Sequence, residues 1–469
     1  MSTSQDLQAR VTQGPIQNLL NLSRNRISQD GVLHLINAFA TSGNTTEVQA
    51  SIEEPWVHKE SVMNLIYLAV QTCRNITEIT ICKDKNLFQL GIRFPHYLEK
   101  VESDVSRLNL CKPEIQHAGF NQRVHENCAR LQELRWSHVE LHSDEAEMLV
   151  RILLPLPELK KFGLMSSSIM PAGMDYLILG LQNCQAIEEL NLGHMKLGSA
   201  AVPKLVLGLR EMPSLKRLIL NHNSIGDDGC CILTEALRNM HYMEEINLSH
   251  NKIGDPGLTT LAAVLLEMQN LKRINLSGNT PSSAGGAKLM EALAYCKCME
   301  ELLLSQNGFG SRTAVKLACC LPHMTNLKVL HLQNNNIGPE GGMELARALV
   351  ACRLLEEISL KLCGVTDDAS KSLSQGFRQC PSMEEIILSW NALGDGGAQE
   401  LASALAGMEK LKVLDLEKNR IGACGASKLA EELVKCPEIQ FIRLWDNPVP
   451  RGLAENLTSQ DPRLCFSFY

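Results

Sequence analysis

The chain has few aromatic residues, no long apolar run and no excess of basic charge: only 4% of its 469 residues are Phe, Trp or Tyr. No stretch reaches about 18 uninterrupted apolar residues, the length of a membrane-spanning helix. Asp and Glu outnumber Lys and Arg by 52 to 45, so the sequence lacks the basic face that binds nucleic-acid phosphates. A hydrophobic content of 45% is too high for a disordered chain. We therefore expect a folded protein whose partners are proteins, not nucleic acids or membranes.

Catalytic and cofactor-binding motifs are also missing from the sequence. It contains no G-x-x-x-x-G-K-[ST], G-x-S-x-G or H-E-x-x-H pattern, and none of its 17 cysteines forms a C-x-x-C pair. We expect no enzymatic activity, no cofactor and no metal. The start, MSTSQDLQAR, is not a secretory signal, so we expect reduced cysteines and a cytoplasmic protein, with the nucleus as an additional location left open.

A repeat of 28 residues with the pattern L-x-x-L-x-L-x-x-N-x-I/L-G dominates the sequence. Its first apolar residue falls at Leu131, Leu159, Ile187, Leu215, Met243, Leu271, Met299, Leu327, Leu355, Met383, Leu411 and Ile439. Weaker copies begin near Gln17, Glu47, Ile76 and Val105, which gives about sixteen units. The sequence thus predicts degenerate repeats over 1–130, regular repeats over 131–449 and a C-terminal cap over 450–469.

One repeat, Leu215 to Tyr242, illustrates the expected structure. Leu218 and Leu220 alternate as in a short strand with one buried face, and Ile225 is expected in the core. The following apolar residues recur at helical spacing and predict a helix of about ten residues. Stacked units place narrow strands on one side and wider helices on the other, so the stack must curve. We predict an α/β solenoid, a horseshoe with parallel strands on the concave face and helices on the convex face.

Two sets of positions are expected to be structural. The asparagines of the repeat should bond backbone groups of adjacent units, more weakly where Ser167, Met195 and Cys363 replace them. The residue three before each unit accepts either Cys or Met, which is typical of a buried packing site. These residues are Cys73, Cys128, Cys184, Met212, Met240, Met268, Cys296, Met324, Cys352, Cys380, Met408 and Cys436.

This repeat resembles the leucine-rich repeat of the ribonuclease-inhibitor type, which is found also in NOD-like receptors and in Ran GTPase-activating proteins. Units such as NHNSIGDDGCCILTEALRNM and WNALGDGGAQELASALAGM are similar to those of NOD-like receptors, and the irregular units between residues 40 and 130 are similar to the branch with the MHC class I transactivator. The resemblance implies a ligand-sensing or regulatory repeat region that acts in innate immune signalling. Because the chain begins almost inside a repeat, we expect it to be part of a longer array.

Charged pairs alternate in sign along the solvent-facing strand positions. Glu188-Glu189, Lys216-Arg217, Glu244-Glu245, Lys272-Arg273, Glu300-Glu301 and Lys328-Val329 should form a ladder of ion pairs across successive strands. The alternation then fails, because Glu356-Glu357 is followed directly by Glu384-Glu385. Like charges on adjacent strands cost free energy. This acidic spot is either a site for a basic partner or an ordinary solvated patch.

Large and charged side chains gather at the exposed positions of the last units. Trp, Phe and Arg on an exposed concave face are the residue types that anchor protein interfaces. We predict a partner-binding site made of Leu362, Trp390, Arg420, Phe441, Arg443, Trp445 and Asp446, together with Glu356 and Glu384 of the acidic spot. Phe441 and Trp445 have a second interpretation, in which they only pack against the C-terminal cap. In ribonuclease inhibitor, by resemblance, an aromatic residue followed by Asp in the last strand engages the target.

Three histidines, His194, His222 and His250, occupy the same position of three consecutive units. Stacked imidazoles can bind a metal or respond to pH, but solvated histidines are the usual case. Overall we predict a non-enzymatic protein-interaction scaffold, monomeric in isolation, that binds protein on its concave face. A ribonuclease-inhibitor-like binding protein and a Ran-type GTPase-activating protein remain the alternatives.

Overall fold

The computed structural model describes residues 17–22, 45–53, 78–84, 87–93, 107–111, 132–137, 140–141, 150, 153, 156, 158–169 and 171–467. The predicted turn residue Asn25 and the predicted packing thiols Cys73 and Cys128 lie outside these residues. The chain divides into two compact units, and each is described by itself. Unit 1 holds residues 1–197 and 203–219, and unit 2 holds residues 198–202 and 220–469.

The sheet of unit 1 is parallel except at one strand. Its strands are β1 (Gln17–Leu22), β2 (Thr45–Glu53), β3 (Glu78–Asp84), β4 (Leu87–Arg93), β5 (Arg107–Cys111), β6 (Glu133–Ser137), β8 (Lys161–Met165), β10 (Glu189–Asn191) and β11 (Arg217–Ile219). Strands β7 (Glu140–Leu141) and β9 (Ser168–Ile169) pair with each other outside this sheet. The described helices of unit 1 are α6 (Pro171–Leu181) and α7 (Gly198–Leu209), although residues 198–202 of α7 belong to unit 2.

Strand β4 corrects the prediction of parallel strands throughout. It pairs antiparallel with both β2 and β3 and so separates two strands that the weak repeat would place side by side. The physical reason is an alternating run of its own: Phe88, Leu90 and Ile92 repeat with the period of a strand and follow β3 after two residues, a separation that allows a hairpin.

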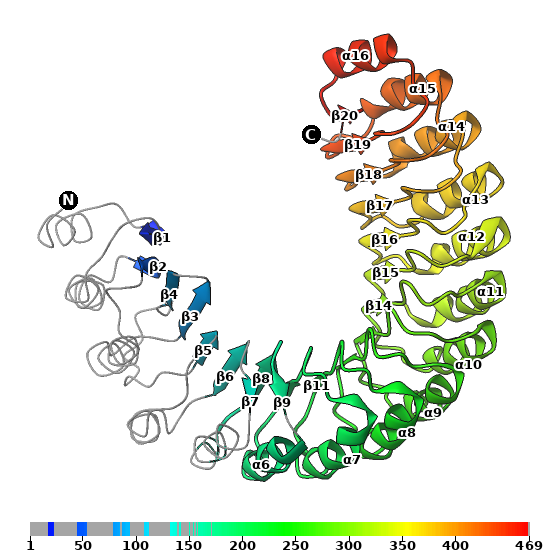
Figure 1. Ribbon diagram of the computed structural model, residues 1–469. Helices are drawn as coiled ribbons and strands as arrows, with labels where there is room; N and C mark the ends of the chain where they lie inside the picture. The colour runs from blue at the N-terminus through cyan, green and yellow to red at the C-terminus, as the bar shows by residue number, and fades with distance from the viewer. Residues whose placement is uncertain are drawn as a thin grey trace, which may run out of the picture. The chain divides into compact units, whose positions relative to one another are not determined.

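Unit 2 is a regular array in which every strand is parallel to the next. Its strands are β12 (Glu245–Asn247), β13 (Arg273–Asn275), β14 (Glu301–Leu303), β15 (Val329–His331), β16 (Glu357–Ser359), β17 (Glu385–Ile387), β18 (Val413–Asp415), β19 (Phe441–Arg443) and β20 (Leu464–Cys465). Each of β12 to β18 pairs with the next in a 28-residue register, for example Ile358 with Ile386. Figure 1 shows these strands on the inner side of unit 2 and its helices on the outer side.

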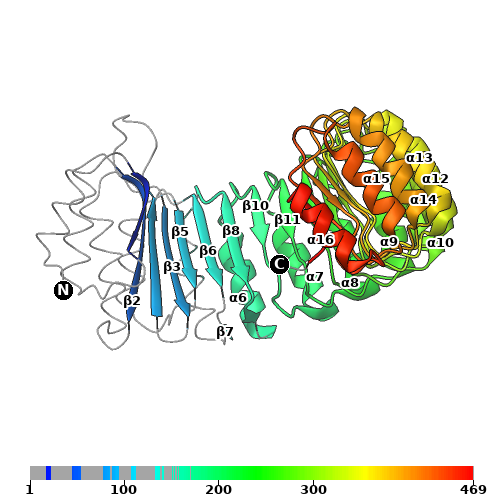
Figure 2. The same ribbon diagram turned by 90° about the horizontal axis from the view of Figure 1, so that it is seen from above.

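The helices of unit 2 stack beside one another along its convex face, as the view in Figure 2 also shows. They are α8 (Gly226–Leu237), α9 (Asp255–Leu265), α10 (Ser283–Leu293), α11 (Ser311–Cys320), α12 (Gly338–Ala348), α13 (Asp367–Arg378), α14 (Asp395–Ala404), α15 (Ala423–Leu433) and α16 (Arg451–Gln460), with short 3-10 helices at Leu321–His323, Leu349–Ala351 and Leu405–Gly407. The described residues include no helix long and apolar enough to cross a membrane.

The core follows the repeat pattern. In the unit that begins at Leu215, Leu218, Leu220 and Ile225 are all fully buried, as predicted, and the predicted helix is α8. The Cys/Met packing site is also confirmed: Cys184, Cys296, Cys352, Cys380 and Cys436 are buried and free. Burial raises the pKa of Cys184 and Cys296 to about 12, so these thiols stay protonated and act as packing groups.

The repeated asparagine bonds two consecutive turns together. The Asn391 side chain accepts hydrogen bonds from the backbone N–H groups of Cys363 and Val365, both at 3.0 Å, and donates to the carbonyls of Leu360 and Leu388. At Cys363 the thiol donates to the Leu332 carbonyl at 3.1 Å, and backbone hydrogen bonds from Asn334 and Asn335 oppose the burial that raises its pKa. A thiol is a weaker donor and a weaker acceptor than a side-chain amide, so the weaker bonding predicted at Cys363 stays a prediction.

An aspartate in the first turn of several helices caps the next helix along the array. Asp227 Oδ1 accepts hydrogen bonds from the N–H groups of Gly254 and Gly257 at 2.8 and 2.9 Å, at the start of α9. Asp395 binds Gly422 and Gly425 in the same way, both at 2.7 Å. A Cβ atom at Gly257 would lie 2.8 Å from the Asp227 oxygen, so the close approach requires glycine. These bonds tie neighbouring helices together on the side opposite the strands.

Candidate functional site

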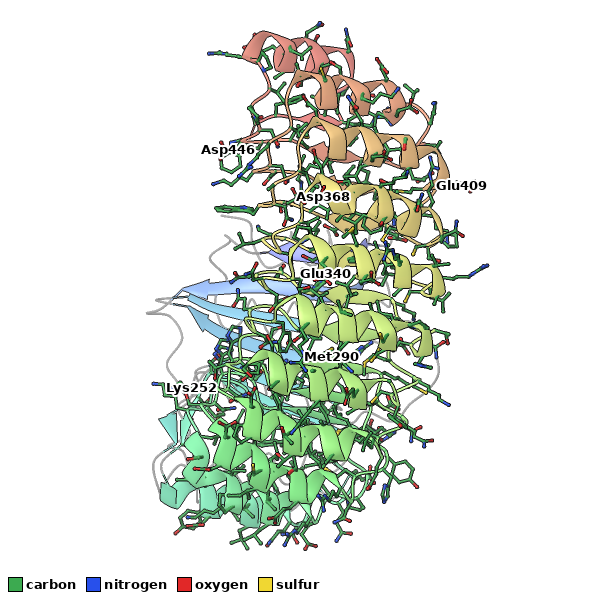
Figure 3. The ribbon with its side chains drawn as sticks, turned by 90° about the vertical axis from the view of Figure 1, so that its right-hand side faces the viewer. Lys252, Met290, Glu340, Asp368, Glu409 and Asp446 are labelled. Carbon is green, nitrogen blue, oxygen red and sulfur yellow. The ribbon has the colours of Figure 1, made fainter. Side chains whose placement is uncertain are left out.

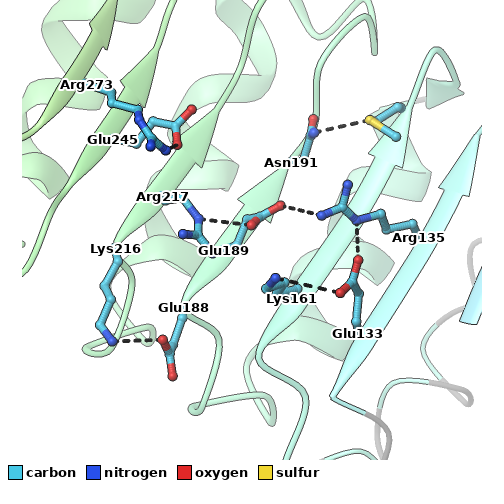
Figure 4. Close-up of polar contacts among 11 residues, drawn as sticks. Glu133, Arg135, Lys161, Glu188, Glu189, Asn191, Lys216, Arg217, Glu245 and Arg273 are labelled. Atoms are coloured by element: carbon cyan, nitrogen blue, oxygen red, sulfur yellow. Dashed lines mark hydrogen bonds and ion pairs between the residues drawn. The ribbon is translucent and has the colours of Figure 1, made fainter. Parts of the chain in front are cut away.

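The concave face of unit 1 carries a closed network of ion pairs (Figure 4). Arg135 contacts Glu133 at 2.7 Å and Glu189 at 3.0 Å, and Arg217 reaches the second oxygen of Glu189 at 3.0 Å. Arg135 can span two strands because Gly163, which lies between them, has no side chain. Both glutamates are buried, and both are satisfied by partners from the same unit. The charges of this network need no external partner.

The predicted ladder continues within unit 2 as far as the strand that contains Val329. Lys272 pairs with Glu244 at 3.2 Å, and Lys328 pairs with Glu300 at 3.1 Å. Arg273 lies between two carboxylates, at 3.7 Å from Glu245 and 2.8 Å from Glu301. The predicted cross-strand ion pairs are thus confirmed inside each unit.

The ladder breaks where two Glu-Glu pairs meet. Glu357 lies directly opposite Glu385 on neighbouring strands, and the His331 ring is 2.6 Å from Glu357. Glu384 already has an intramolecular partner, Lys412, at 2.6 Å, whereas Glu356 is exposed and has no ion pair among the described residues. Burial, together with the neighbouring Glu357, raises the pKa of Glu385. This region therefore carries carboxylates whose negative charge the chain compensates incompletely.

A second acidic group, Asp415 and Glu417, lies in the next repeat, at the end of β18 and in the turn that follows it. Asp415 is 7% exposed, and its Oδ1 accepts a hydrogen bond from the Glu417 N–H at 3.0 Å. Burial and the nearby Asp415 raise the pKa of Glu417, while the Arg443 guanidinium acts in the opposite sense. The carboxylates of Glu385, Asp415 and Glu417 thus give the C-terminal part of this face a negative field with one adjacent guanidinium.

In the described part of the chain, the turns that follow β8 and β10 to β19 each contain a residue in the left-handed conformation, always at the same repeat position. We call these residues the left-handed column: Ser166, His194, His222, His250, Gly278, Gln306, Asn334, Leu362, Trp390, Lys418 and Asp446. A positive φ is unfavourable for any residue with a Cβ. In unit 2 it is stabilised because the N–H donates to the carbonyl of the next turn, as from Trp390 to Glu417 at 2.8 Å.

The left-handed column corrects the predicted placement of Leu362, Trp390 and Asp446. The strands are only three residues long, so these residues lie in the turn beyond each strand and not on the strand itself. They therefore stand along one edge of the concave face. In Figure 3, Asp446 lies at this edge of unit 2 and Glu409 lies at the opposite one.

At the C-terminal end, three residues of the left-handed column and the neighbouring Trp445 form a cluster of two indoles around one ammonium group. Lys418 Nζ is 3.9 Å from the centre of the Trp390 ring and 4.8 Å from that of Trp445, and 3.6 Å from Asp446 Oδ2. Lys361 lies 6.0 Å from the Trp390 ring. These cation–π contacts hold Trp390 in place although 43% of it is exposed. We call Trp390, Lys418, Trp445 and Asp446 the tryptophan cluster.

Sequence reasoning missed Lys418, which connects the other members of the cluster. Its position in the repeat is the same as that of Trp390, and this register is the signal that could have revealed it. Of the remaining predicted residues, Leu362 is 46% exposed, and Arg420 is exposed and forms no ion pair within the described residues.

Phe441 and Arg443 lie in β19, as predicted, beside the C-terminal cap. The short strand β20 pairs with β19 and so covers the edge of the last repeat. Phe441, which is 43% exposed, and Arg443 line an open hollow together with cap residues such as Phe466. Trp445 is half-buried and contacts Lys418, not the hollow.

The predicted stacking of histidines is confirmed for one pair in unit 2. The His222 and His250 rings are 4.1 Å apart and nearly parallel. Within the described part of the chain, no three His, Cys, Asp or Glu side chains are grouped so that they could hold a metal ion. The pair is an aromatic contact of the left-handed column, and we propose no metal site for it.

Comparisons with known proteins agree with this repeat. Residues 211–230, 239–262, 323–346, 379–402 and 407–430 match the family model Leucine Rich repeat. Protein NLRC5 of Homo sapiens is 39% identical over 146 residues, which are 30% of this chain and 8% of that protein. Protein NLRC5 of Mus musculus is 32% identical over 149 residues, which are 31% of this chain and 8% of that protein. Protein NLRC5 of Ictalurus punctatus is 29% identical over 187 residues, which are 37% of this chain and 10% of that protein. The matched residues thus span about a tenth or less of these relatives.

Two solved structures were also found to be similar. An internalin (inlF) from Listeria monocytogenes has 16% identity and a TM-score of 0.49, over 76% of this chain and 92% of that one. A leucine-rich-repeat protein of Leptospira interrogans has 15% identity and a TM-score of 0.40, over 74% of this chain and 98% of that one. From the matched repeats and the parallel strand–helix array, the chain is a leucine-rich-repeat solenoid whose repeats resemble those of the NLRC5 proteins.

Proposed function

We propose that this chain is the ligand-sensing or regulatory repeat region of a NOD-like receptor and acts in innate immune signalling as a non-enzymatic protein-binding scaffold. The similarity to NLRC5 repeats over 30–37% of the chain supports the receptor class. The regular array supports a binding role, because a repeat fixes the shape of a surface and leaves recognition to a few variable side chains. We place the protein in the cytoplasm, with access to the nucleus left open, and infer that it is monomeric in isolation.

The observation that carries the proposal is the tryptophan cluster. Trp390 is 43% exposed and yet held in position by the Lys418 ammonium on its ring. A large, preorganised aromatic side chain is the residue type that contributes most to protein interfaces, because little conformational entropy is lost when it is covered. The cluster therefore supplies an anchor point at the edge of the concave face.

Electrostatics indicates the character of the partner. In unit 1 the buried carboxylates of Glu133 and Glu189 are neutralised by arginines of the chain. In the C-terminal part of unit 2, Glu356 has no ion pair among the described residues, and the pKa values of Glu385 and Glu417 are raised by burial and by neighbouring carboxylates. A partner that brings Lys or Arg beside these carboxylates would remove this repulsion. We propose a protein partner with a basic patch next to an apolar pocket for Trp390.

The test compares two single substitutions that place a carboxylate at an exposed apolar position. Trp390→Glu changes the proposed anchor, and Val434→Glu changes a residue that follows α15 and is 73% exposed. Both tagged variants and the wild type are used for proximity labelling and affinity capture in immune-stimulated cells, with quantitative mass spectrometry. We expect a set of partners enriched in proteins with basic surfaces to be lost at least tenfold with Trp390→Glu and retained with Val434→Glu.

The same experiment can reject the proposal. Identical partner sets for wild type and Trp390→Glu would remove the cluster as an anchor. Partners dominated by a secreted ribonuclease or a small GTPase would favour the ribonuclease-inhibitor-like or Ran-type alternatives, and a GTP-hydrolysis assay with the captured GTPase would then separate binding from activation. Size-exclusion chromatography with light scattering checks the inferred monomer.

A further inference from the structure

The bonds between neighbouring repeats weaken at one junction of unit 2, between the repeats that begin at Leu271 and Met299. We call it the α10–α11 junction, after the helices that meet there (Figure 1). Asp227 ties α8 to α9, and Asp255 ties α9 to α10, through hydrogen bonds to backbone N–H groups. The next repeat has Ser283 at this position, and its side chain forms no hydrogen bond among the described residues. The series of aspartate contacts therefore stops at α10.

The backbone at the α10–α11 junction has the conformation that the missing contact requires. Gly310, at the N-cap of α11, has a φ of −101°, close to the −103° of Gly254 and the −99° of Gly394, which both accept an aspartate contact. A Cβ atom at Gly310 would lie 3.5 Å from Ser283 Oγ, whereas at Gly254 it would lie 3.0 Å from an oxygen of Asp227. The serine thus occupies the place of the aspartate but is too short and carries no charge.

The asparagine bonds between turns are weakened at the same junction. Asn335 makes three hydrogen bonds to the turn before it: Oδ1 accepts from the N–H groups of Asn307 and Phe309, and Nδ2 donates to a carbonyl. Asn307 makes only one such bond within the described residues, from the Asn279 N–H at 2.9 Å. Pro281 stands at the position equivalent to Phe309 and has no N–H to donate.

A small cavity lies beside the two helices. Its volume is about 10 Å³, and its lining includes Met290 of α10, which is labelled in Figure 3, and Phe309 in the turn before α11. Thr313, Ala314 and Leu317 of α11 complete this side of it, and all five residues are buried. Side chains that line a cavity lack packing partners there and lose dispersion contacts. The packing between α10 and α11 is therefore weakened as well.

The contacts that remain hold the strands more firmly than the helices. Lys316 of α11 pairs with Glu291 of α10 at 2.8 Å, but their side chains are 44% and 61% exposed, so this ion pair adds little stability. The Thr313 hydroxyl donates to a carbonyl in the first turn of α10 at 3.4 Å, which is long. Strands β13 and β14, in contrast, stay in register and carry the ion pair of Arg273 with Glu301 at 2.8 Å.

We propose that the α10–α11 junction is a hinge of unit 2, at which the two helices separate while β13 and β14 stay paired. Helices α8, α9 and α10 move together, because Asp227 and Asp255 tie them to one another. Opening and closing at the helix side changes the local curvature of the array, and a partner that contacts both sides of the hinge selects one curvature. This hinge is independent of the tryptophan cluster, so it can be tested in the free protein.

Two native thiols report the opening of a junction. Cys320, at the end of α11, donates to the Met290 carbonyl of α10 at 3.0 Å, and Cys230 of α8 donates to the Gly257 carbonyl of α9 at 3.5 Å. Cys320 thus lies in the proposed hinge, and Cys230 lies in a junction with an aspartate contact. Burial raises the pKa of Cys320 to about 11 and that of Cys230 to about 12, so each thiol reacts when its junction opens.

The test is the rate at which N-ethylmaleimide labels each thiol of the full chain under native conditions. All proteins carry Cys319→Ser, because the neighbouring Cys319 is exposed and would react first. Mass spectrometry follows each site, and each rate is divided by that of the same thiol in the chemically unfolded chain. We expect the corrected rate of Cys320 to exceed that of Cys230 at least tenfold.

Variants show whether the missing bonds cause the opening. Ser283→Asp supplies the carboxylate, while Ala284→Asp adds the same charge in the same turn of α10 but away from the contact position. A hydrogen bond to a charged group corresponds to about tenfold or more, so Ser283→Asp should slow the labelling of Cys320 by that factor. Pro281→Ile, which restores an N–H donor, should slow it about threefold. Ala284→Asp should have a smaller effect than either, and the labelling of Cys230 should stay unchanged throughout.

Three results would overturn the proposal. The first is equal corrected rates for Cys320 and Cys230 in the chain that carries only Cys319→Ser. The second is equal labelling of Cys320 in Ser283→Asp and Ala284→Asp. The third comes from hydrogen exchange: if the amides of β14 open as often as Cys320 reacts, the whole repeat unfolds and the strands are not the axis of a hinge.

Discussion

The aspartate contacts between neighbouring helices give the most direct test of how this array is held together. Asp227 and Asp228 are adjacent in the first turn of α8, and both carry a charge near its N-terminus. Only Asp227 reaches the next helix, where it accepts two backbone hydrogen bonds from Gly254 and Gly257. Asp228 is exposed. Substitutions of Asp227 and Asp228 can therefore be compared: both remove a favourable interaction with the helix dipole, but only the substitution of Asp227 also removes the contact between repeats.

The expected loss follows from these two bonds. A hydrogen bond to a charged group contributes about 1.5–3 kcal/mol. Both bonds end on a single, half-buried oxygen, so their sum falls short of additivity and we expect Asp227→Ala to cost about 2–3 kcal/mol. Asp228→Ala loses only the dipole interaction, about 0.3–1 kcal/mol.

The assay must be local, because long repeat arrays need not unfold in one step. Hydrogen exchange with mass spectrometry, on a peptide that contains Gly254 and Gly257, reports the opening of this junction. We expect Asp227→Ala to lower protection there by about 30- to 150-fold, the equivalent of 2–3 kcal/mol, with little change in peptides beyond residue 400. Equal effects of Asp227→Ala and Asp228→Ala would refute the reasoning, since the contact between repeats would then contribute nothing.

Three further predictions address the concave face and its edge. Cys363→Asn should replace a weak sulfur acceptor with an amide oxygen and stabilise the protein by about 1 kcal/mol in denaturant titration, whereas Cys363→Ala should destabilise it. Glu385→Gln should raise the free energy of unfolding at pH 7 by about 0.2–1 kcal/mol, because Glu357 lies opposite Glu385. The pKa of Glu385 is raised in the folded protein, so the wild type regains this free energy as the pH falls through that pKa. The melting temperature of the variant should therefore change less than that of the wild type between pH 7 and 5. Lys418→Met should increase acrylamide quenching of tryptophan fluorescence while lowering stability by less than about 1 kcal/mol, and Lys418→Arg should preserve the cation contact with Trp390.

The regular part of the fold could be predicted because one spacing determines it. A constant step of 28 residues puts Ile358 opposite Ile386 and fixes which side chains enter the core. It also predicts the ion pairs, since charges at one repeat position must face each other on adjacent strands. Strand β4 escaped prediction because its alternating run belongs to no repeat, and only a two-residue gap separates it from β3.

The candidate sites were harder to predict because they depend on where side chains point, which the spacing of residues in the sequence does not give. The sequence identified Trp390 and Asp446 as exposed, but their contact through Lys418 follows from the left-handed backbone of the turn. The hollow depends on where the cap returns to β19, and the cap obeys no repeat rule. Local periodicity therefore locates surface positions, while the tertiary path decides which of them meet.

Three independent departures from the repeat pattern occur in one strand and its following turn, residues 355–366. Its Glu356-Glu357 pair ends the alternation of charge, its turn has Cys363 in place of asparagine, and its left-handed residue is Leu362, which is 46% exposed. Each departure costs stability by a different mechanism: like-charge repulsion, a sulfur in place of a stronger amide hydrogen-bonding group, and an exposed apolar side chain in a strained conformation. Natural sequences tend to break local rules where function requires it. Because Trp390 follows in the very next repeat, the binding face that we propose adjoins a repeat of unit 2 that departs from the pattern in three ways.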